Sequence, residues 1–514
     1  MTRVFSERRN TLVNEPDKGR AWLIAVACSI ISFFLFGIFR SYGILYLEII
    51  TTFQTTRAQA SWPHSLCGTI FNLVGILVGL LGHHLSYRSI VTSGMFLLAL
   101  SASLCYFAQS LTHLILFLGV LQGIALGIAL PMLPVIICRS FQKYRAFAIG
   151  LACAGATISS FVFPPLLEFL LYSYTLRGAM LIMGGVVLHS VIFAMFLRPP
   201  VRIYSKTPEC AVHNEAMVLT LSLLKKDELS VQPDERIKAR KIVKPLNNSL
   251  PIAIQDETKE SNELHSQDAS PTVLICGTND HNTPEKFQEP IQQLHDKNNK
   301  NTKSFVGSLR VLLSLCSNLM FILIAVTHSI FFGTMHTFFM IITDFAVDQG
   351  VPDSAAGYLI IGFSAGDTLG SILIPWVIDQ FSVKRKSSII VSMLLLGVFF
   401  ALFSVASTNF TLHLLCSGCG ILAGLARVLI TVVVPEYLGL EDQAIAQGLL
   451  MFVVGITSLC RPVLVGYFRD NIGAYNNLFH TLGILDIVVA LMWTLEPIIL
   501  RQRVSITQKE VTVK

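Results

Sequence analysis

Long apolar runs alternate with short polar segments along most of the chain. A membrane-spanning helix needs about 20 mostly apolar residues, and twelve runs of the chain meet that requirement. The runs cover approximately 21–47, 61–82, 89–109, 112–138, 146–172, 176–198, 310–343, 354–379, 387–407, 410–438, 444–468 and 477–500. The pattern therefore predicts an all-α membrane protein with 12 transmembrane helices.

The segment 199–308 breaks this pattern, because it is rich in Lys, Glu, Asp, Asn, Gln and Pro and has no long apolar run. Such a composition cannot bury enough apolar surface to fold alone, so we expect a largely disordered loop. The predicted organisation is a tail at 1–20, a six-helix bundle at 21–198, the loop at 199–308, a second six-helix bundle at 309–500 and a tail at 501–514.

Composition agrees with a membrane protein. Of the 514 residues, 53% are hydrophobic and 14% are charged, whereas soluble domains carry about 25% charged residues. The net charge of +6 is dispersed, so no nucleic-acid partner is expected. No catalytic or nucleotide motif is present, and we predict neither an enzyme nor a cofactor. Cys416 and Cys419 form a CxxC inside an apolar run, which favours helix packing over a metal site.

Lys and Arg in the short loops predict the orientation of the helices. If the N-terminus is cytosolic, the inner segments carry 16 of these residues and the outer segments carry 3. Positive charge favours the cytosolic side, so both termini and the loop 199–308 are predicted to be cytosolic. The first apolar run is too long for a cleavable signal. With no retrieval or transit signal, the plasma membrane is the expected location.

The two halves of the chain resemble each other. At an offset of 296, Phe36-Gly37 matches Phe332-Gly333, and Arg40 matches His336. At an offset of 298, the positions 146, 148, 150, 151, 158, 160, 164 and 166 are identical to 444, 446, 448, 449, 456, 458, 462 and 464. Repeats in the same order with an even number of helices are parallel repeats about an axis along the membrane normal, as in alternating-access transporters.

Several segments carry a family resemblance. The run 140–155, SFQKYRAFAIGLACAG, resembles the fifth-helix signature of the monocarboxylate transporter family, although Ser140, Tyr144 and Phe147 depart from it. The segment 17–22, DKGRAW, resembles the signature before helix one, with Lys18 and Arg20 as departures. Further similar segments are 163–167, 177–179, 438–441 and 448–450. The resemblance covers all twelve predicted helices, and it implies the major facilitator superfamily fold with two pseudo-symmetric six-helix bundles.

Ionisable groups inside a bilayer are functional candidates by default. Arg40 lies in the outer half of helix one, where a guanidinium can bind a carboxylate in bidentate fashion. The resemblance supports this role, since proton-coupled members have a basic residue at this point. The alternative is a structural arginine paired with an acid. His336, the repeat counterpart of Arg40, could serve as a hydrogen-bond donor or as a group that titrates near neutral pH. The alternative is a histidine packed between helices.

Asp367 lies in the middle of the eighth predicted helix, 354–379. The resemblance implies an Asp here and an Arg one turn later for proton coupling, but this chain has Ser371 at the second position. The carboxyl must therefore find another partner or stay protonated. Arg427 and Arg461 are candidates to supply the missing charge, and a structural role beside Pro462 is the stronger reading for Arg461.

The remaining candidates concern gating and the cavity wall. Lys143 and Arg145 precede helix five and are predicted to form gate salt bridges with Asp17 or Glu168, against ordinary positive-inside topology. His83 and His84 are interpreted as loop cations and not as metal ligands. The residues predicted to line the cavity are Tyr42, Asn72, Phe338 and Phe363, with apolar packing as the alternative for the aromatic ones.

These residues support a secondary transporter of a small organic anion or monocarboxylate, working by alternating access, with proton symport left open by Ser371. One alternative is a facilitative transporter of aromatic amino acids, iodothyronine-like or other amphipathic solutes. The other is a membrane sensor or scaffold that moves no solute. The expected partners are the substrate, the lipid bilayer and, by resemblance alone, a single-span immunoglobulin-like ancillary protein.

Overall fold

The computed structural model describes residues 17–81, 85–197, 307–308, 310–406, 408–472 and 475–501. All regular structure within these ranges is helical. The predictions for most of the loop 199–308, for residues 1–16 and 502–514, and for His83 and His84 lie outside the described residues.

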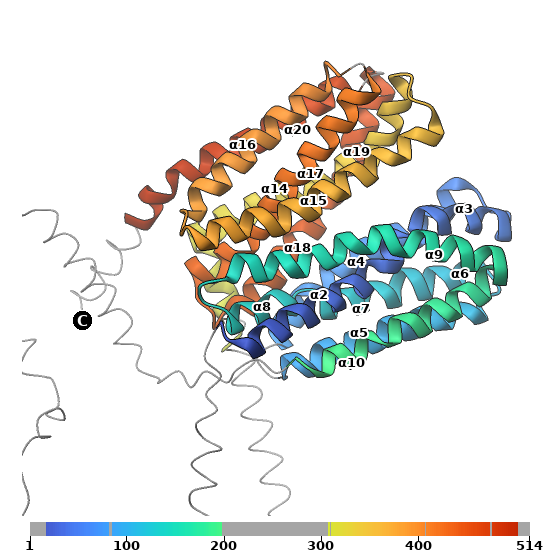
Figure 1. Cartoon of the computed structure of the whole chain (residues 1–514), viewed down its shortest axis with the longest axis horizontal. Coiled ribbons are helices and arrows are strands. Elements are labelled where there is room, and N and C mark those ends of the chain that lie inside the picture. Colours follow the sequence, from blue (N-terminus) through green and yellow to red (C-terminus); the bar gives the residue numbers. More distant parts are fainter. Residues whose placement is uncertain are drawn as a thin grey trace, which may run out of the picture. The chain divides into compact units, whose positions relative to one another are not determined.

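The first half of the chain contributes the helices drawn in blue to green in Figure 1. They are α2 (Gly19–Arg40), α3 (Tyr42–Phe53), α4 (Arg57–Leu81), α5 (Tyr87–Leu104), η1 (Cys105–Phe107), α6 (Leu111–Leu114), η2 (Ile115–Leu121), α7 (Gln122–Ala129), α8 (Met132–Ser140), α9 (Arg145–Leu188) and α10 (Ser190–Met195).

The second half contributes the helices drawn in yellow to red (Figure 1). They are α14 (Leu319–Asp348), α15 (Asp353–Gln380), α16 (Arg385–Phe403), α17 (Asn409–Leu438), α18 (Gln443–Ser458), α19 (Arg461–Gly466), η3 (Tyr467–Ile472), α20 (Asn476–Met492) and η4 (Trp493–Leu495).

The described residues contain eleven helical segments that are long and apolar enough to cross a membrane. One of them, Arg145–Met195, has 51 residues and would extend about 76 Å at 1.5 Å per residue, more than twice the roughly 30 Å of hydrocarbon. It is bent at Thr175, where φ is 60° and ψ is 170°. This segment therefore crosses twice, which agrees with the twelve predicted helices.

Two of the breaks within predicted helices lie beside candidate residues. Helix one stops at Arg40 and resumes at Tyr42, because Ser41 leaves the helical conformation and its hydroxyl donates to the carbonyl of Gly37. Helix eleven is interrupted between α18 and α19, and Pro462 lies in the first turn of the new helix, a position that proline tolerates.

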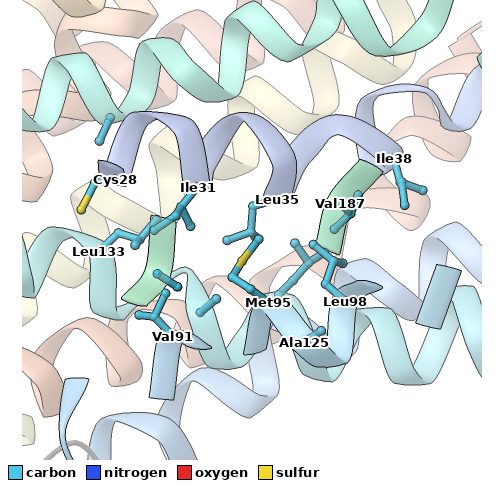
Figure 2. Close-up of a cluster of buried hydrophobic side chains, with 14 of the residues drawn as sticks. Cys28, Ile31, Leu35, Ile38, Val91, Met95, Leu98, Ala125, Leu133 and Val187 are labelled. Carbon is cyan, nitrogen blue, oxygen red and sulfur yellow. The ribbon is translucent and has the colours of Figure 1, made fainter. Parts of the chain in front are cut away.

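Each half has its own hydrophobic core. The first core is formed almost entirely by residues before 198, and the second almost entirely by residues after 314. Figure 2 shows the centre of the first core, where Ile31 and Leu35 of α2 face Met95 and Leu98 of α5. The second core is more aromatic, with Phe338 within 5.7 Å of the rings of Phe363, Phe400 and Phe403.

The halves meet along two helix pairs, α4 with α18 and α9 with α15. Glycines allow the close approach, because a Cβ at Gly150 would collide with the carbonyl of Ser371, and one at Gly448 with the carbonyl of Gly75. Gly150 and Gly448 are repeat counterparts at the offset of 298, and Gly75 and Ser371 are counterparts at the offset of 296. The sequence repeat therefore corresponds to a repeated packing contact between the halves.

Candidate functional site

Arg40 lies at the contact between the two halves. It ends α2, directly before the break at Ser41, and a cation at the last turn of a helix is favoured by the helix dipole. Its guanidinium lies 5.9 Å from the ring centroid of Phe339 on α14 of the other half. Asp367 and Arg427 are near enough to act on it electrostatically. Within the described residues, Arg40 has no carboxylate within 4.0 Å.

Asp367 and Arg427 form an ion pair near the middle of the second half. A guanidinium nitrogen of Arg427 donates to Asp367 Oδ1 at 2.7 Å and to the hydroxyl of Ser371 at 3.0 Å. The carboxylate side chain is 4% exposed and the guanidinium side chain 20%. Arg427 therefore supplies the positive charge beside Asp367 that an arginine at position 371 would otherwise provide. Removing one member of a buried pair leaves a buried charge without compensation.

Glycines on α15 and α17 bring this pair together. Backbone atoms of α17 would block a Cβ at Gly366 and Gly370, and backbone atoms of α15 would block one at Gly420 and Gly424. Each helix therefore has two glycines four residues apart, the spacing that lets membrane helices approach closely. This Gly-xxx-Gly spacing is visible in the sequence and is the signal by which the contact of helices eight and ten could have been predicted.

His336 lies on α14, near a histidine of the first half. It is within electrostatic range of His64, Arg40 and Arg461, and its ring is 5.9 Å from that of Phe332. His64 comes from α4 of the first half and stacks on Tyr42 at 4.4 Å. A lone histidine in an apolar run carries no local signal, so His64 could be found only through its neighbours in space.

Tyr42 and Asn72 lie buried, each with a local hydrogen bond. The hydroxyl of Tyr42 donates to the carbonyl of Ala60 at 3.2 Å, which fixes the ring under His64. The amide of Asn72 donates to the carbonyl of Gly68 at 2.8 Å, and its Cβ faces Gly455 of the other half. Asn72 thus belongs to the contact of α4 with α18.

The two phenylalanines predicted to line the cavity lie in the aromatic core of the second half. Phe338 is 1% exposed and Phe363 is 3% exposed. Phe363 also packs against Phe339, at 4.7 Å between ring centroids. Apolar packing, the alternative considered from the sequence, describes both side chains.

Asp17 binds the turn before α9 through its backbone. The carboxylate accepts N–H bonds from Gln142, Lys143 and Tyr144 at 3.1 to 3.3 Å. The ammonium of Lys143 lies 5.0 Å from the ring centroid of Tyr144, and Arg145 donates to the carbonyl of Phe141. These contacts stay within the first half.

Glu168 cannot pair with Arg145. Both residues lie on α9, 23 positions apart, which corresponds to about 35 Å along a helix. Glu168 is exposed near the other end of its crossing.

Two further polar contacts at this end of the molecule join the two halves. Asp379 at the end of α15 accepts the backbone N–H of Phe147 on α9 at 2.9 Å. Its other oxygen pairs with Arg385 at 3.0 Å, and Arg385 also pairs with Glu436. Arg139 of α8 donates to the carbonyl of Leu440 at 3.2 Å. We call the end of the molecule with Asp17, Lys143 and Arg385 the basic end.

A cavity of about 650 Å³ opens at the basic end, lined in part by Lys143, Asp379, Arg385 and Glu436. Next to it, Glu496 accepts from Lys386 at 2.8 Å and from the hydroxyl of Tyr437 at 3.0 Å. The positive and negative groups of this region are therefore largely matched with one another.

At the opposite end, Arg469 pairs with Asp348 and lies 4.7 Å from the ring centroid of Tyr475. The hydroxyl of Tyr475 donates to Asp344 at 2.6 Å. Burial, and then this hydrogen bond, raises the pKa of Tyr475 to about 12, so the hydroxyl stays a donor at neutral pH. All of these groups belong to the second half.

Comparison with known proteins agrees with this geometry. Residues 24–249 and 308–510 match the model of the Major Facilitator Superfamily. Monocarboxylate transporter 12 of Mus musculus is 26% identical over 481 residues, 92% of this chain and 85% of that relative. Monocarboxylate transporter 7 of Homo sapiens is 22% identical over 484 residues, 92% of this chain and 85% of that relative.

A shorter match has higher identity. Monocarboxylate transporter 13 of Rattus norvegicus is 38% identical over 187 residues, and this match spans 36% of the chain and 43% of that relative. With two related halves, twelve crossings and a match that covers most of its length, the chain belongs to the Major Facilitator Superfamily and is a multi-pass membrane protein related to the monocarboxylate transporters.

Proposed function

We propose that this chain is a secondary transporter that moves a small organic anion, and that Arg40 binds the carboxylate of the substrate between the two halves. One observation carries the proposal: the guanidinium of Arg40 has no ion-pair partner within the described residues, although it lies within electrostatic range of Asp367 and Arg427 of the other half. Burying such a charge is costly unless it is paired. A substrate carboxylate bound in bidentate fashion would compensate it.

The contacts between the halves support alternating access. Asp379 with Phe147, and Arg139 with Leu440, join the halves at the basic end. We infer that these contacts separate the site around Arg40 from the basic end and its cavity, and that the substrate enters from the opposite end. Transport would then break these few polar contacts while the halves rock about the glycine contacts of α4 with α18 and α9 with α15.

Proton coupling would involve Asp367. Its carboxylate holds Arg427 at 2.7 Å. A proton on Asp367 would neutralise one member of the pair and release Arg427 toward the substrate. Ser371 supports this role, since its hydroxyl offers Arg427 a second, uncharged partner at 3.0 Å.

Aromatic rings beside the charged groups favour a second candidate, an amphipathic solute with a carboxylate and an apolar body. Phe339 lies against Arg40, and Phe39 lies 4.6 Å from the ring of His64. An uptake panel at pH 6 and pH 7.5 separates the candidates. Acid-stimulated uptake of lactate or pyruvate supports the small anion with proton symport, and pH-independent uptake of aromatic amino acids supports the amphipathic solute.

The substitution Arg40→Gln tests the proposed site. Purified protein in proteoliposomes should lose uptake by about tenfold or more, because the lost charged hydrogen bonds contribute about 1.5–3 kcal/mol. Arg40→Lys keeps the charge without the bidentate geometry and should retain part of the uptake. Arg469→Gln, which removes a positive charge already paired with Asp348, is the matched control. Undiminished uptake by Arg40→Gln would remove Arg40 from the site.

We propose that the basic end, both termini and the loop 199–308 lie in the cytosol of a plasma-membrane protein, in line with the bias of Lys and Arg in the short loops. Epitopes at either terminus of protein expressed in intact cells should stain only after permeabilisation. Co-purification with a single-span ancillary protein would test the partner that the resemblance implies. Staining of intact cells would show that the termini face outward, which would contradict the proposed orientation and the proposed direction of substrate entry.

A further inference from the structure

Three basic side chains from both halves gather next to Arg40, on the side away from the basic end. His64 comes from the start of α4, His336 from the middle of α14 and Arg461 from the start of α19. His336 is within electrostatic range of His64, Arg40 and Arg461, and His64 is within range of Arg461. Asp367 and Arg427 lie deeper, near the middle of their spans.

These side chains have polar atoms that lack partners. Nδ1 of His64, Nδ1 of His336 and Nε of Arg461 are buried and have no hydrogen bond within the described part of the chain. Buried polar atoms are usually hydrogen-bonded, and a group of exceptions in one place needs an explanation. A bound molecule with acceptor oxygens would satisfy donors of this kind, since an imidazole offers at least one N–H and a guanidinium five.

Packing holds the imidazole rings in place. His64 lies between Phe39 and Tyr42, at 4.6 Å and 4.4 Å between ring centroids. His336 lies against Phe332 at 5.9 Å. Rings that are fixed by packing lose little freedom on binding, which favours affinity. A structural role for Arg461 beside Pro462 would explain its position on the helix but not the matching unpaired atoms on two other helices.

The unpaired positive charges in this region also indicate an anionic ligand. Arg40, Arg427 and Arg461 carry three positive charges, and within the described residues Asp367 is the one carboxylate paired with any of them. Two positive charges therefore remain uncompensated in the region around Arg40. One substrate carboxylate, as in the proposed function, balances only one of them.

We propose that Arg461, His64 and His336 form a second anion subsite, so that the preferred substrate carries a second oxyanion in addition to the carboxylate bound by Arg40. This inference rests on the proposed function, because Arg40 supplies the first subsite. It goes beyond that function by selecting dianionic organic acids over simple monocarboxylates of the same length.

The test compares matched pairs of acids in proteoliposomes that contain the full chain. Butyrate is compared with succinate, and hexanoate with adipate, at pH 7.5, where carboxylic acids are ionised. The wild type should take up each dianion with a KM about tenfold lower than that of its monoanion, the difference expected for one charged hydrogen-bonded contact.

Variants separate the two subsites. Arg461→Gln should raise the KM for the dianions about tenfold and leave the monoanions within about twofold, because only the dianions reach this subsite. Arg461→Lys should restore part of the preference. Arg40→Gln should reduce uptake of both classes. Should Arg461→Gln fail to fold, His64→Gln and His336→Gln provide the same comparison with smaller effects.

Each outcome has one meaning. Equal KM values for mono- and dianions in the wild type, or an equal loss of both classes in Arg461→Gln, overturns the second subsite and leaves the proposed function standing. Full activity of Arg40→Gln toward both classes, or no anion uptake by the wild type, overturns the proposed function itself. Loss of the dianion preference in Arg461→Gln, with Arg469→Gln unchanged, supports the second subsite.

Discussion

The two halves share a scaffold but bury different chemistry. Within the described residues of the first half, no Asp, Glu, Lys or Arg side chain is fully buried, whereas the second half buries four carboxyl groups. These are Asp367, Asp379, Asp486 and Glu496. Three of them pair with Arg427, Arg385 and Lys386, and the fourth accepts a hydrogen bond from Thr334. Ionisable groups inside a membrane are costly, so this asymmetry indicates that the halves have different tasks.

The contacts between the halves show the same difference at the level of single residues. Thr157 and Thr368 share a hydrogen bond of 2.7 Å, and their repeat counterparts Gly455 and Asn72 meet without one. One residue earlier, Asp367 corresponds to Phe71 at the same offset of 296. The duplicated backbone therefore keeps its packing while the side chains diverge. We infer that the first half provides mainly apolar packing and the cation Arg40. The second half provides the Asp367–Arg427 pair, whose charge and contacts change during transport.

The largest effect is expected where the asymmetry is greatest, at Asp367. Asp367→Leu would leave Arg427 buried without its partner, which costs about 3–5 kcal/mol. We expect a clear fall in the thermal unfolding temperature of the protein in detergent, together with loss of uptake. Its counterpart substitution Phe71→Leu should cost less than about 1.5 kcal/mol.

A double substitution sharpens this result. Asp367→Leu combined with Arg427→Met removes both charges and should recover most of the stability, but not the uptake. If the single and double variants were equally unstable, the ion pair would not be the reason for the asymmetry.

The second prediction concerns the close glycine contacts that both halves contribute to their interface. Gly150→Ala and Gly448→Ala should each destabilise the protein, by about 1–3 kcal/mol, because an added Cβ collides with a backbone carbonyl of the other half. Gly185→Ala is the control, because Gly185 lies on the same long helix as Gly150 and an added Cβ there would meet no atom of another helix within 4 Å. The unfolding temperature in detergent measures the effect. A large effect at only one of the two counterparts would break the proposed equivalence of the contacts.

The third prediction concerns the basic end. Asp379→Asn weakens both the pair with Arg385 and the bond to the N–H of Phe147, and hydrogen bonds to charged groups contribute about 1.5–3 kcal/mol. We expect a shift toward the state that is open at the basic end. Cysteines introduced near Lys143 should then react faster with a thiol reagent applied from that side. Glu496→Gln, which affects a pair within the second half alone, should leave the reaction rate unchanged.

The smallest effect is expected for the exposed pair at the opposite end. Arg469 pairs with Asp348, and both side chains are more than one third exposed. Surface ion pairs contribute little, and salt screens them. Arg469→Gln should therefore leave uptake and the unfolding temperature unchanged at physiological salt. A strong loss of uptake would assign this pair to the gate and would contradict its use as a control.

Much of the fold was predictable because it depends on one-dimensional patterns. Runs of about 20 apolar residues predicted the crossings, and the repeat predicted which helices correspond. The break after Arg40 was not predictable, since Ser41 is a common helix residue and its bond to Gly37 competes with the helix only locally. The contact of α15 with α17 was missed although its glycines are visible at the required spacing.

The candidate site divides in the same way. Arg40, His336, Asp367 and Arg427 stood out because charge inside an apolar run is rare. His64 did not, because a histidine near the end of a predicted helix has many ordinary explanations. The closing contacts at the basic end were not predictable, because Arg385 is typical of loop ends and because the partner of Asp379, the N–H of Phe147, is a backbone group that the sequence cannot distinguish.

The sequence by itself determined the number of helices, the relation between the two halves and the presence of charged residues inside the membrane, because hydropathy and internal repetition act along the chain. The tertiary structure alone decided which charges are paired and which are not. Pairing depends on helix rotation and on close approaches of less than 4 Å between residues as distant as Asp367 and Arg427. Small residues such as Gly150 and Gly448, and breaks at Ser41 and before Arg461, set these approaches, and their effect appears only when the helices are packed together.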